Sequence, residues 1–217
     1  MFKPSLVVQV IDEACVGCNQ CVNVCPSGAL SLDKHRRKAV LEESRCVGCM
    51  KCVEQCIPYG AIGIQPNPNG QQLGIPPEER DEAAASELCA KARLAPEQVV
   101  CVCTGTTASE VAAAIVDGIT EPEDITMATG VRAQCGWLCL SPVTRLLEAS
   151  GNPLSRPKQD YRIYPEATQV AIWNIPDGID EKYPEYRLKE SLEAIEAGTL
   201  NEPAPWLPDI QPGRTDA

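Results

Sequence analysis

The sequence predicts an α+β protein with two small cysteine-rich parts and an extended C-terminal arm. Three observations lead to this prediction. Two cysteine runs of identical spacing are flanked by short apolar, β-branched segments typical of strands, and a later group of four cysteines lies among helix-start signals. In addition, nine of the 19 prolines fall in the last 67 residues. Because proline interrupts helices and central strands, we expect those residues to be extended.

The first cysteine-rich part contains one four-cysteine pattern twice. Both runs read C-x-x-C-x-x-C-x-x-x-C, and they comprise Cys15, Cys18, Cys21, Cys25 and Cys46, Cys49, Cys52, Cys56. The residues around the cysteines repeat as well, since Cys15-Val16-Gly17-Cys18 recurs as Cys46-Val47-Gly48-Cys49. The part is therefore an internal duplication, and a pseudo-twofold pair is expected.

This spacing is typical of thiolates that hold [4Fe–4S] clusters. Three cysteines in a tight loop bind three irons, and the fourth leaves the loop to bind the other cluster. Small residues such as Gly17 and Gly48 let backbone amides approach the sulfides. The spacing assigns Cys15, Cys18, Cys21 and Cys56 to one cluster, and Cys46, Cys49, Cys52 and Cys25 to the other.

Residues 5–65, approximately, resemble the bacterial two-cluster ferredoxins. The resemblance implies a ferredoxin-like 2[4Fe–4S] domain. The second run departs from the family pattern, because Ile57 is inserted between Cys56 and Pro58. Zinc ribbons are the alternative, since they also use Cys-x-x-Cys pairs. Eight cysteines in two identical runs favour the iron–sulfur interpretation.

A third constellation is Cys101-x-Cys103, which 31 residues separate from Cys135-x-x-x-Cys139. Capping boxes at Thr107–Glu110 and Thr120–Glu123, and the pair Ser141-Pro142, predict helix starts nearby. Four thiolates at helix ends suit a [2Fe–2S] cluster, which needs two ligands per iron. The Cys-x-Cys pair would serve one iron and the distal pair the other.

Cys101 to about Ala149 resembles the bacterioferritin-associated ferredoxin domain, which also occurs inside larger flavoenzymes and nitrite reductases. The resemblance rests on Cys101-x-Cys103-Thr104-Gly105 and on Thr129-Gly130-Val131-Arg132 before Cys135. It implies a small helical [2Fe–2S] domain. The family most often closes with Cys-x-x-Cys, whereas this chain has one residue more. A zinc site and structural disulfides are the alternatives here.

The remaining elements follow from apolar patterning and from proline. Strands are expected at Leu6–Ile11, Leu30–Leu32, Ala39–Leu41 and Ala61–Ile64, a short helix at 20–25 and a longer one at Pro77–Arg93. Residues 65–77 contain four prolines and read as a linker. In the arm, Tyr186–Ala197 is expected to be helical. The predicted segments are thus a 2[4Fe–4S] domain (1–65), a linker and helix (66–98), a [2Fe–2S] domain (99–150) and a partner-binding arm (151–217). For the arm, the alternative is that it wraps the chain's own two small domains.

Two further residues could carry chemistry. His35 is the sole histidine and lies in the basic segment His35–Lys38, which we interpret as a solvated turn, with a docking patch for an acidic partner as the alternative. Cys89 is the thirteenth cysteine, left over after three groups of four. It is expected to be a small buried side chain, and a redox-active thiol is the alternative.

Composition excludes several classes of function. The net charge of -11 argues against nucleic acid as a partner. No 18-residue apolar stretch predicts a membrane span, and no signal-like segment precedes the first strand, so a cytoplasmic protein with reduced thiols is expected. No Gly-x-Gly-x-x-Gly fingerprint predicts a flavin or nicotinamide site.

Together these features predict the iron–sulfur electron-transfer subunit of a multisubunit oxidoreductase, without a substrate site of its own. Two [4Fe–4S] clusters and one [2Fe–2S] cluster would relay single electrons to or from a flavoprotein or metal-cofactor subunit. A freely diffusing ferredoxin and an iron-handling or regulatory iron–sulfur protein are the alternatives. Residues 1–65 carry seven basic and six acidic side chains, which is not the acidic docking surface of a diffusing ferredoxin.

Overall fold

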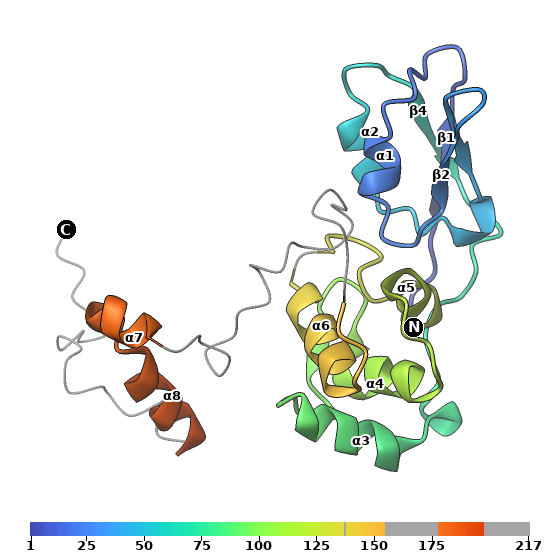
Figure 1. The fold of residues 1–217 in the computed structure, drawn as a ribbon. Coiled ribbons are helices and arrows are strands. Elements are labelled where there is room, and N and C mark those ends of the chain that lie inside the picture. The colour runs from blue at the N-terminus through green and yellow to red at the C-terminus, as the bar shows by residue number, and fades with distance from the viewer. Residues whose placement is uncertain (137, 155–177, 198–217) are drawn as a thin grey trace, which may run out of the picture. The chain divides into compact units, whose positions relative to one another are not determined.

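The computed structural model describes residues 1–136, 138–154 and 178–197. The chain divides into two compact units, Met1–Gln169 and Val170–Ala217. The first unit contains all the predicted cluster ligands, and Figure 1 shows its two parts, one with strands and one helical. Among the described residues, no helix is long and apolar enough to cross a membrane.

Two antiparallel strand pairs frame the cysteine runs. Strand β1 (Leu6–Val10) pairs with β4 (Ile62–Pro66), and β2 (Leu30–Asp33) pairs with β3 (Lys38–Leu41). The expected strands are therefore confirmed. The turn between β2 and β3 leaves His35 exposed, as expected for a surface histidine.

The two cysteine runs, which repeat in sequence, also share a backbone structure, because each contains one short helix. Helix α1 (Gln20–Asn23) and helix α2 (Lys51–Gln55) lie against each other, and each follows a non-glycine residue in the left-handed conformation. These residues are Asn19, with φ 67°, and Met50, with φ 62°. Equivalent backbone turns thus place the third cysteine of each run, Cys21 and Cys52, in a shared core with Val8, Leu30 and Ile62.

The segment after β4 is packed, although its composition predicts a linker. Leu73 and Phe2 exchange both backbone hydrogen bonds at 2.7 Å, and the Leu73 side chain is buried against Val47 and Ala133. The prolines keep the segment extended, and one apolar side chain is enough to anchor it. Residues Pro77–Glu79 form a single 3₁₀ turn, η2.

Helix α3 (Glu82–Lys91) begins five residues later than expected. Asp81 caps it by accepting a hydrogen bond from the Ala84 N–H at 3.0 Å. The paired prolines at 76 and 77 favour a start at Pro77, but Arg80 is extended, with ψ 140°, and breaks the helical path before Asp81. A side-chain cap therefore decides the boundary.

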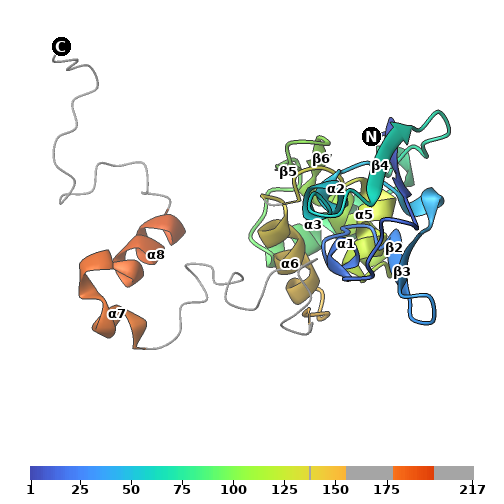
Figure 2. The ribbon, with the colours of Figure 1, turned by 90° about the horizontal axis from the view of Figure 1, so that it is seen from above.

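The helical part packs around α4 (Ala108–Val116), whose residues 108–115 are all buried. Helices α3, α5 (Pro122–Thr129) and α6 (Leu140–Ala149) surround it, with the small pair β5 (Val99–Cys101) and β6 (Thr106–Thr107) at one end. Figure 2 shows α3, α5, α6 and the β5–β6 pair from above. Leu88, Val111 and Val143 join the three longer helices in one apolar core.

All three helices expected in this part are present, and one of their three expected caps is confirmed. Thr107 caps α4 by accepting from the Glu110 N–H at 3.3 Å. The Thr120 capping box is wrong, because Pro122 takes the first helical position and makes Glu121 the cap residue. The Ser141 cap is also wrong, because α6 already begins at Leu140, directly after Cys139.

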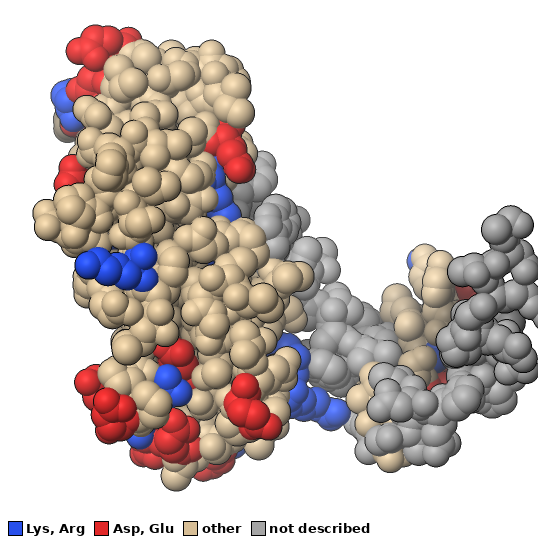
Figure 3. All heavy atoms as spheres, turned by 180° about the vertical axis from the view of Figure 1, so that it is seen from behind, with Lys and Arg blue, Asp and Glu red and all other residues tan. Residues whose placement is uncertain are grey.

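The part with strands and the helical part of the first unit are joined by polar and apolar contacts. Arg45, in the 3₁₀ turn η1 (Glu43–Arg45), forms an ion pair of 2.7 Å with Asp124 of α5. The Gly74 N–H donates to the Ala128 carbonyl at 3.0 Å. On the face shown in Figure 3, acidic side chains gather over the helical part, while broad uncharged surface covers the part above it.

The described residues of the second unit form helix α7 (Ile179–Lys182), the turn η5 (Pro184–Tyr186) and helix α8 (Leu188–Glu196). The expected helix at Tyr186–Ala197 is confirmed as α8, and α7 was not expected. The Tyr183 and Tyr186 rings meet edge to face with centroids 6.3 Å apart. Most aromatic residues of the predicted arm, including Tyr161, Tyr164, Trp173 and Trp206, lie outside the described residues.

Candidate functional site

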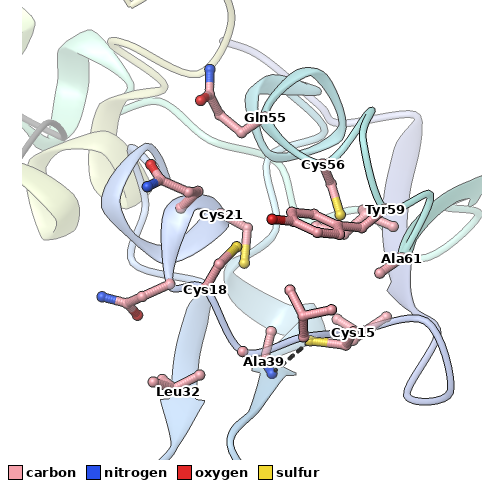
Figure 4. A pocket seen from close by; sticks show the side chains of 15 residues that line it. Cys15, Cys18, Cys21, Leu32, Ala39, Gln55, Cys56, Tyr59 and Ala61 are labelled. Atoms are coloured by element: carbon pink, nitrogen blue, oxygen red, sulfur yellow. Dashed lines mark hydrogen bonds between the residues drawn. The ribbon is translucent and has the colours of Figure 1, made fainter.

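The first site is a pocket that contains four of the predicted ligands: Cys15, Cys18, Cys21 and Cys56. Three come from the loop before α1 and from α1 itself, and Cys56 follows α2. Figure 4 shows their sulfurs facing a common space closed by Tyr59 and Ala39. The Ala39 N–H points at the Cys15 sulfur at 3.4 Å, as a donor to a thiolate does.

The second site repeats this construction. Cys25, Cys46, Cys49 and Cys52 line one pocket together with small and apolar residues such as Gly48 and Ala29. Ser27, which is fully buried, places its hydroxyl 3.7 Å from the Cys25 sulfur. Both pockets therefore collect three cysteines from one run and the fourth from the other, which is the pattern that the spacing predicts.

Burial makes these thiols poor acids when no metal is bound. Burial, followed by the neighbouring Cys18 and Cys15, raises the pKa of Cys21 to about 11. Burial also raises the pKa of Cys49 to about 11. The pKa of Cys52 is raised as well, by burial and then by Cys49. Thiolates in such pockets need a positive counter-charge, which bound iron supplies.

The third site comprises Cys101, at the end of β5, and Cys103, in the turn that follows. Cys135, in the loop after α5, and Cys139, at the start of α6, complete it. The Cys103 and Cys135 sulfurs are exposed and 3.4 Å apart. The buried Cys139 thiol donates to Cys101, which lowers the pKa of Cys101 to about 5 and raises that of Cys139. Each close pair, Cys103 with Cys135 and Cys101 with Cys139, thus joins one cysteine of the Cys-x-Cys pair to one of the distal pair. Ligation of one iron by Cys101 and Cys103 stays a prediction.

Two cations, Lys38 and Arg132, support these sites, although the sequence predicts neither side chain as a supporting residue. Lys38 donates to the backbone carbonyls of Cys15, at 2.6 Å, and Asp12, at 2.7 Å, so it supports the first cysteine loop instead of belonging to a solvated turn. Arg132 is fully buried with φ 68°, and its backbone N–H favours the thiolates of Cys101 and Cys139. Sequence spacing alone gives no signal for either contact.

The residues of the first and second sites suit [4Fe–4S] clusters. Within the described ranges, no three histidine, cysteine, aspartate or glutamate side chains converge as ligands of a metal ion. The first and second sites instead each place four sulfurs around a pocket lined by small and apolar residues. Bound in such pockets, iron–sulfur clusters supply reversible one-electron chemistry.

Comparison with known proteins gives the same two domains in the same order. The 4Fe-4S dicluster domain family matches residues 14–61, and the BFD-like [2Fe-2S] binding domain family matches residues 99–149. A ferredoxin-like protein in the nif region of Azotobacter vinelandii is 40% identical over 81 residues, which cover 34% of this chain and 88% of that protein. No solved structure matches the chain significantly.

The cofactors are therefore two [4Fe–4S] clusters and one [2Fe–2S] cluster. The expected resemblances to a two-cluster ferredoxin and to a bacterioferritin-associated ferredoxin domain are both confirmed. By its dicluster domain, its BFD-like domain and its Azotobacter relative, the chain belongs to the ferredoxin-like iron–sulfur electron-transfer proteins.

Proposed function

We propose that this chain is the electron-transfer subunit of a multisubunit oxidoreductase and exchanges single electrons with a partner subunit that carries flavin or another metal centre. Cys15, Cys18, Cys21 and Cys56 hold one [4Fe–4S] cluster, and Cys25, Cys46, Cys49 and Cys52 hold the other. Cys101, Cys103, Cys135 and Cys139 hold the [2Fe–2S] cluster. The proposal gives the chain no substrate site of its own.

The order of the three sites is the observation that carries this proposal. Cys21 of the first site and Cys52 of the second belong to one apolar core. Cys49 of the second site and Cys135 of the third line one cavity. The sites therefore follow one another through the first unit, and adjacency of this kind supports a relay more than it supports storage of iron.

Exposed apolar side chains at both ends of the series support docking of partners. Val16 and Ile57 flank the first site and are 51% and 76% exposed. Val102 and Leu138 flank the third site and are 73% and 75% exposed. Since large apolar side chains at the surface mark interaction sites when they gather, each end suits contact with another protein.

Metal content tests the ligand assignment. Anaerobically purified chain is expected to contain about ten irons and about ten acid-labile sulfides, the sum of two four-iron clusters and one two-iron cluster. Cys18→Ala and Cys49→Ala are each expected to lose one [4Fe–4S] cluster. Stoichiometric zinc without labile sulfide would contradict the assignment.

Copurification tests the subunit role. The full chain is expected to elute anaerobically with a flavin- or metal-containing subunit, and a chain ending at Ser150 is expected to keep its iron but to elute alone. The second result follows if residues 151–217 are the arm that binds the partner. A full chain that elutes alone with all its iron would favour a diffusing carrier.

A further inference from the structure

Lys51 occupies the junction of the second and third sites. It is the first residue of α2 and lies between the second-site ligands Cys49 and Cys52 in sequence. A cavity of about 400 Å³ brings Lys51 together with Cys49 and with Cys135 of the third site. Two loops that are far apart in the sequence therefore meet around one lysine.

The lysine side chain is directed toward the third site. Gly136 follows Cys135 and has φ 63°, and a side-chain carbon at this position would collide with the Lys51 ammonium group. The ammonium thus packs against the backbone of the third-site loop, although Lys51 belongs to the second cysteine run. The Lys51 side chain is only partly exposed, so solvent screens its charge incompletely.

The charge of the ammonium has a direct consequence for both sites. Four thiolates give each site a negative charge that increases by one when its cluster is reduced. A cation held nearby stabilises the reduced form more than the oxidised form, and this effect is stronger where water is partly excluded. A cation between two sites acts on both.

We propose that Lys51 is an electrostatic residue shared by the second and third sites, where its ammonium raises the reduction potentials of both clusters. This inference rests on the ligand assignment proposed above. Two other cations act more locally. Lys38 donates to the backbone of the first cysteine loop, and Arg132 lies buried beside Cys101 and Cys139.

The test is an anaerobic redox titration of the full chain followed by electron paramagnetic resonance, with iron counted in every sample. Lys51→Gln is expected to shift the potentials of the second and third sites to more negative values and to leave the first site unchanged. Lys51→Arg keeps the charge and is expected to keep the wild-type potentials of all three. Lys38→Gln is the matched control, and it is expected to shift the first site alone.

The outcomes separate this inference from the function on which it rests. A wild-type chain without about ten irons contradicts the ligand assignment itself. A Lys51→Gln chain that keeps its iron and its wild-type potentials overturns the shared role of Lys51, and so does a shift confined to one site or equal at all three. If Lys51→Gln loses iron, the redox titration is repeated on Lys51→Met, which keeps the unbranched stem, and the same outcomes decide.

Discussion

Cys89 lies in the middle of α3 with its side chain fully buried, as expected for the cysteine left over from the three sites. Burial, with smaller effects of Glu82 and Glu97, raises its pKa to about 11. A thiol that holds its proton this firmly is a poor nucleophile and a poor metal ligand. Cys89→Ala is therefore expected to leave the iron and sulfide content unchanged, and loss of any cluster would contradict this.

The same thiol predicts a pH dependence. Its pKa rises from 9.0 to about 11 on folding, so above pH 9 the unfolded chain loses a proton that the folded chain keeps. The contribution of Cys89 to stability is complete below pH 9 and is lost as the pH rises through 11. Denaturation of wild type and Cys89→Ala across this range is expected to show a smaller loss of stability in the variant.

Glu110 is a buried charge that does not complete its capping box. Its side chain turns away from Thr107, accepts from the Ile75 N–H at 3.0 Å and lies 3.5 Å from the Arg80 guanidinium. Removing one partner of a buried pair leaves the other uncompensated, which costs roughly 3 kcal/mol. Glu110→Ala is expected to lower the free energy of unfolding by about this amount.

The matched control is Glu87, an exposed residue of α3 that pairs with Lys91 at 2.8 Å. Exposed ion pairs on a helix contribute little to stability, so Glu87→Ala is expected to change stability little. Equal losses for Glu87→Ala and Glu110→Ala in denaturant titrations would show that the Glu110 contacts contribute little.

The ligand cysteines could be recognised from the sequence, whereas the side chains that support them could not. Spacing within one loop is local, so the sets around each pocket follow from it. The approach of Lys51 to Gly136 and the burial of Arg132 depend on how two distant loops pack. No periodicity or motif in a single sequence reports that packing.

At the scale of elements, glycines in and after the second cysteine run adopt the left-handed backbone conformation. Gly48 has φ 64°, and a side-chain carbon there would collide with the carbonyl oxygen of Leu6 in β1. Gly60 has φ 59° and no atom within 4 Å of that position. Both positions favour glycine for conformation, but only Gly48 lacks space.

Gly48→Ala is therefore expected to push the second cysteine loop away from β1 and to lose the iron of the second site. Gly60→Ala is expected to keep its iron and to cost about 1 kcal/mol of backbone strain. Iron analysis of the two purified variants checks both expectations. A Gly48→Ala chain with its full iron content would show that the loop tolerates displacement.

Helix boundaries near proline could be predicted only in part. The Thr107 cap is correct because its side chain alone decides where α4 begins. The start expected at Pro77 is wrong because Arg80 is extended and the Asp81 side chain caps α3. The start expected at Ser141 is wrong because α6 already begins at Leu140, directly after Cys139. Proline permits a helix start without requiring one.

At the scale of the whole molecule, composition predicts a linker at residues 65–77, but in the structure this segment packs against both parts of the first unit. Apolar content there is low, yet Leu73 is 1% exposed and packs between Val47 of the second cysteine run and Ala133 of the third-site loop. Average composition cannot identify a single anchoring residue. Leu73 therefore connects the second cysteine run with the third-site loop.

Leu73→Ala is expected to destabilise the first unit by about 3 kcal/mol, because a buried leucine is replaced by a cavity. The loss affects the contact between the two parts, so the clusters of both parts are expected to bleach at a lower temperature. Melting followed by visible absorbance measures this. Asp124→Asn, which removes the partly exposed ion pair with Arg45, is expected to cost less than about 1 kcal/mol. If Asp124→Asn proved the more damaging change, the ion pair and not the Leu73 contact would hold the two parts together.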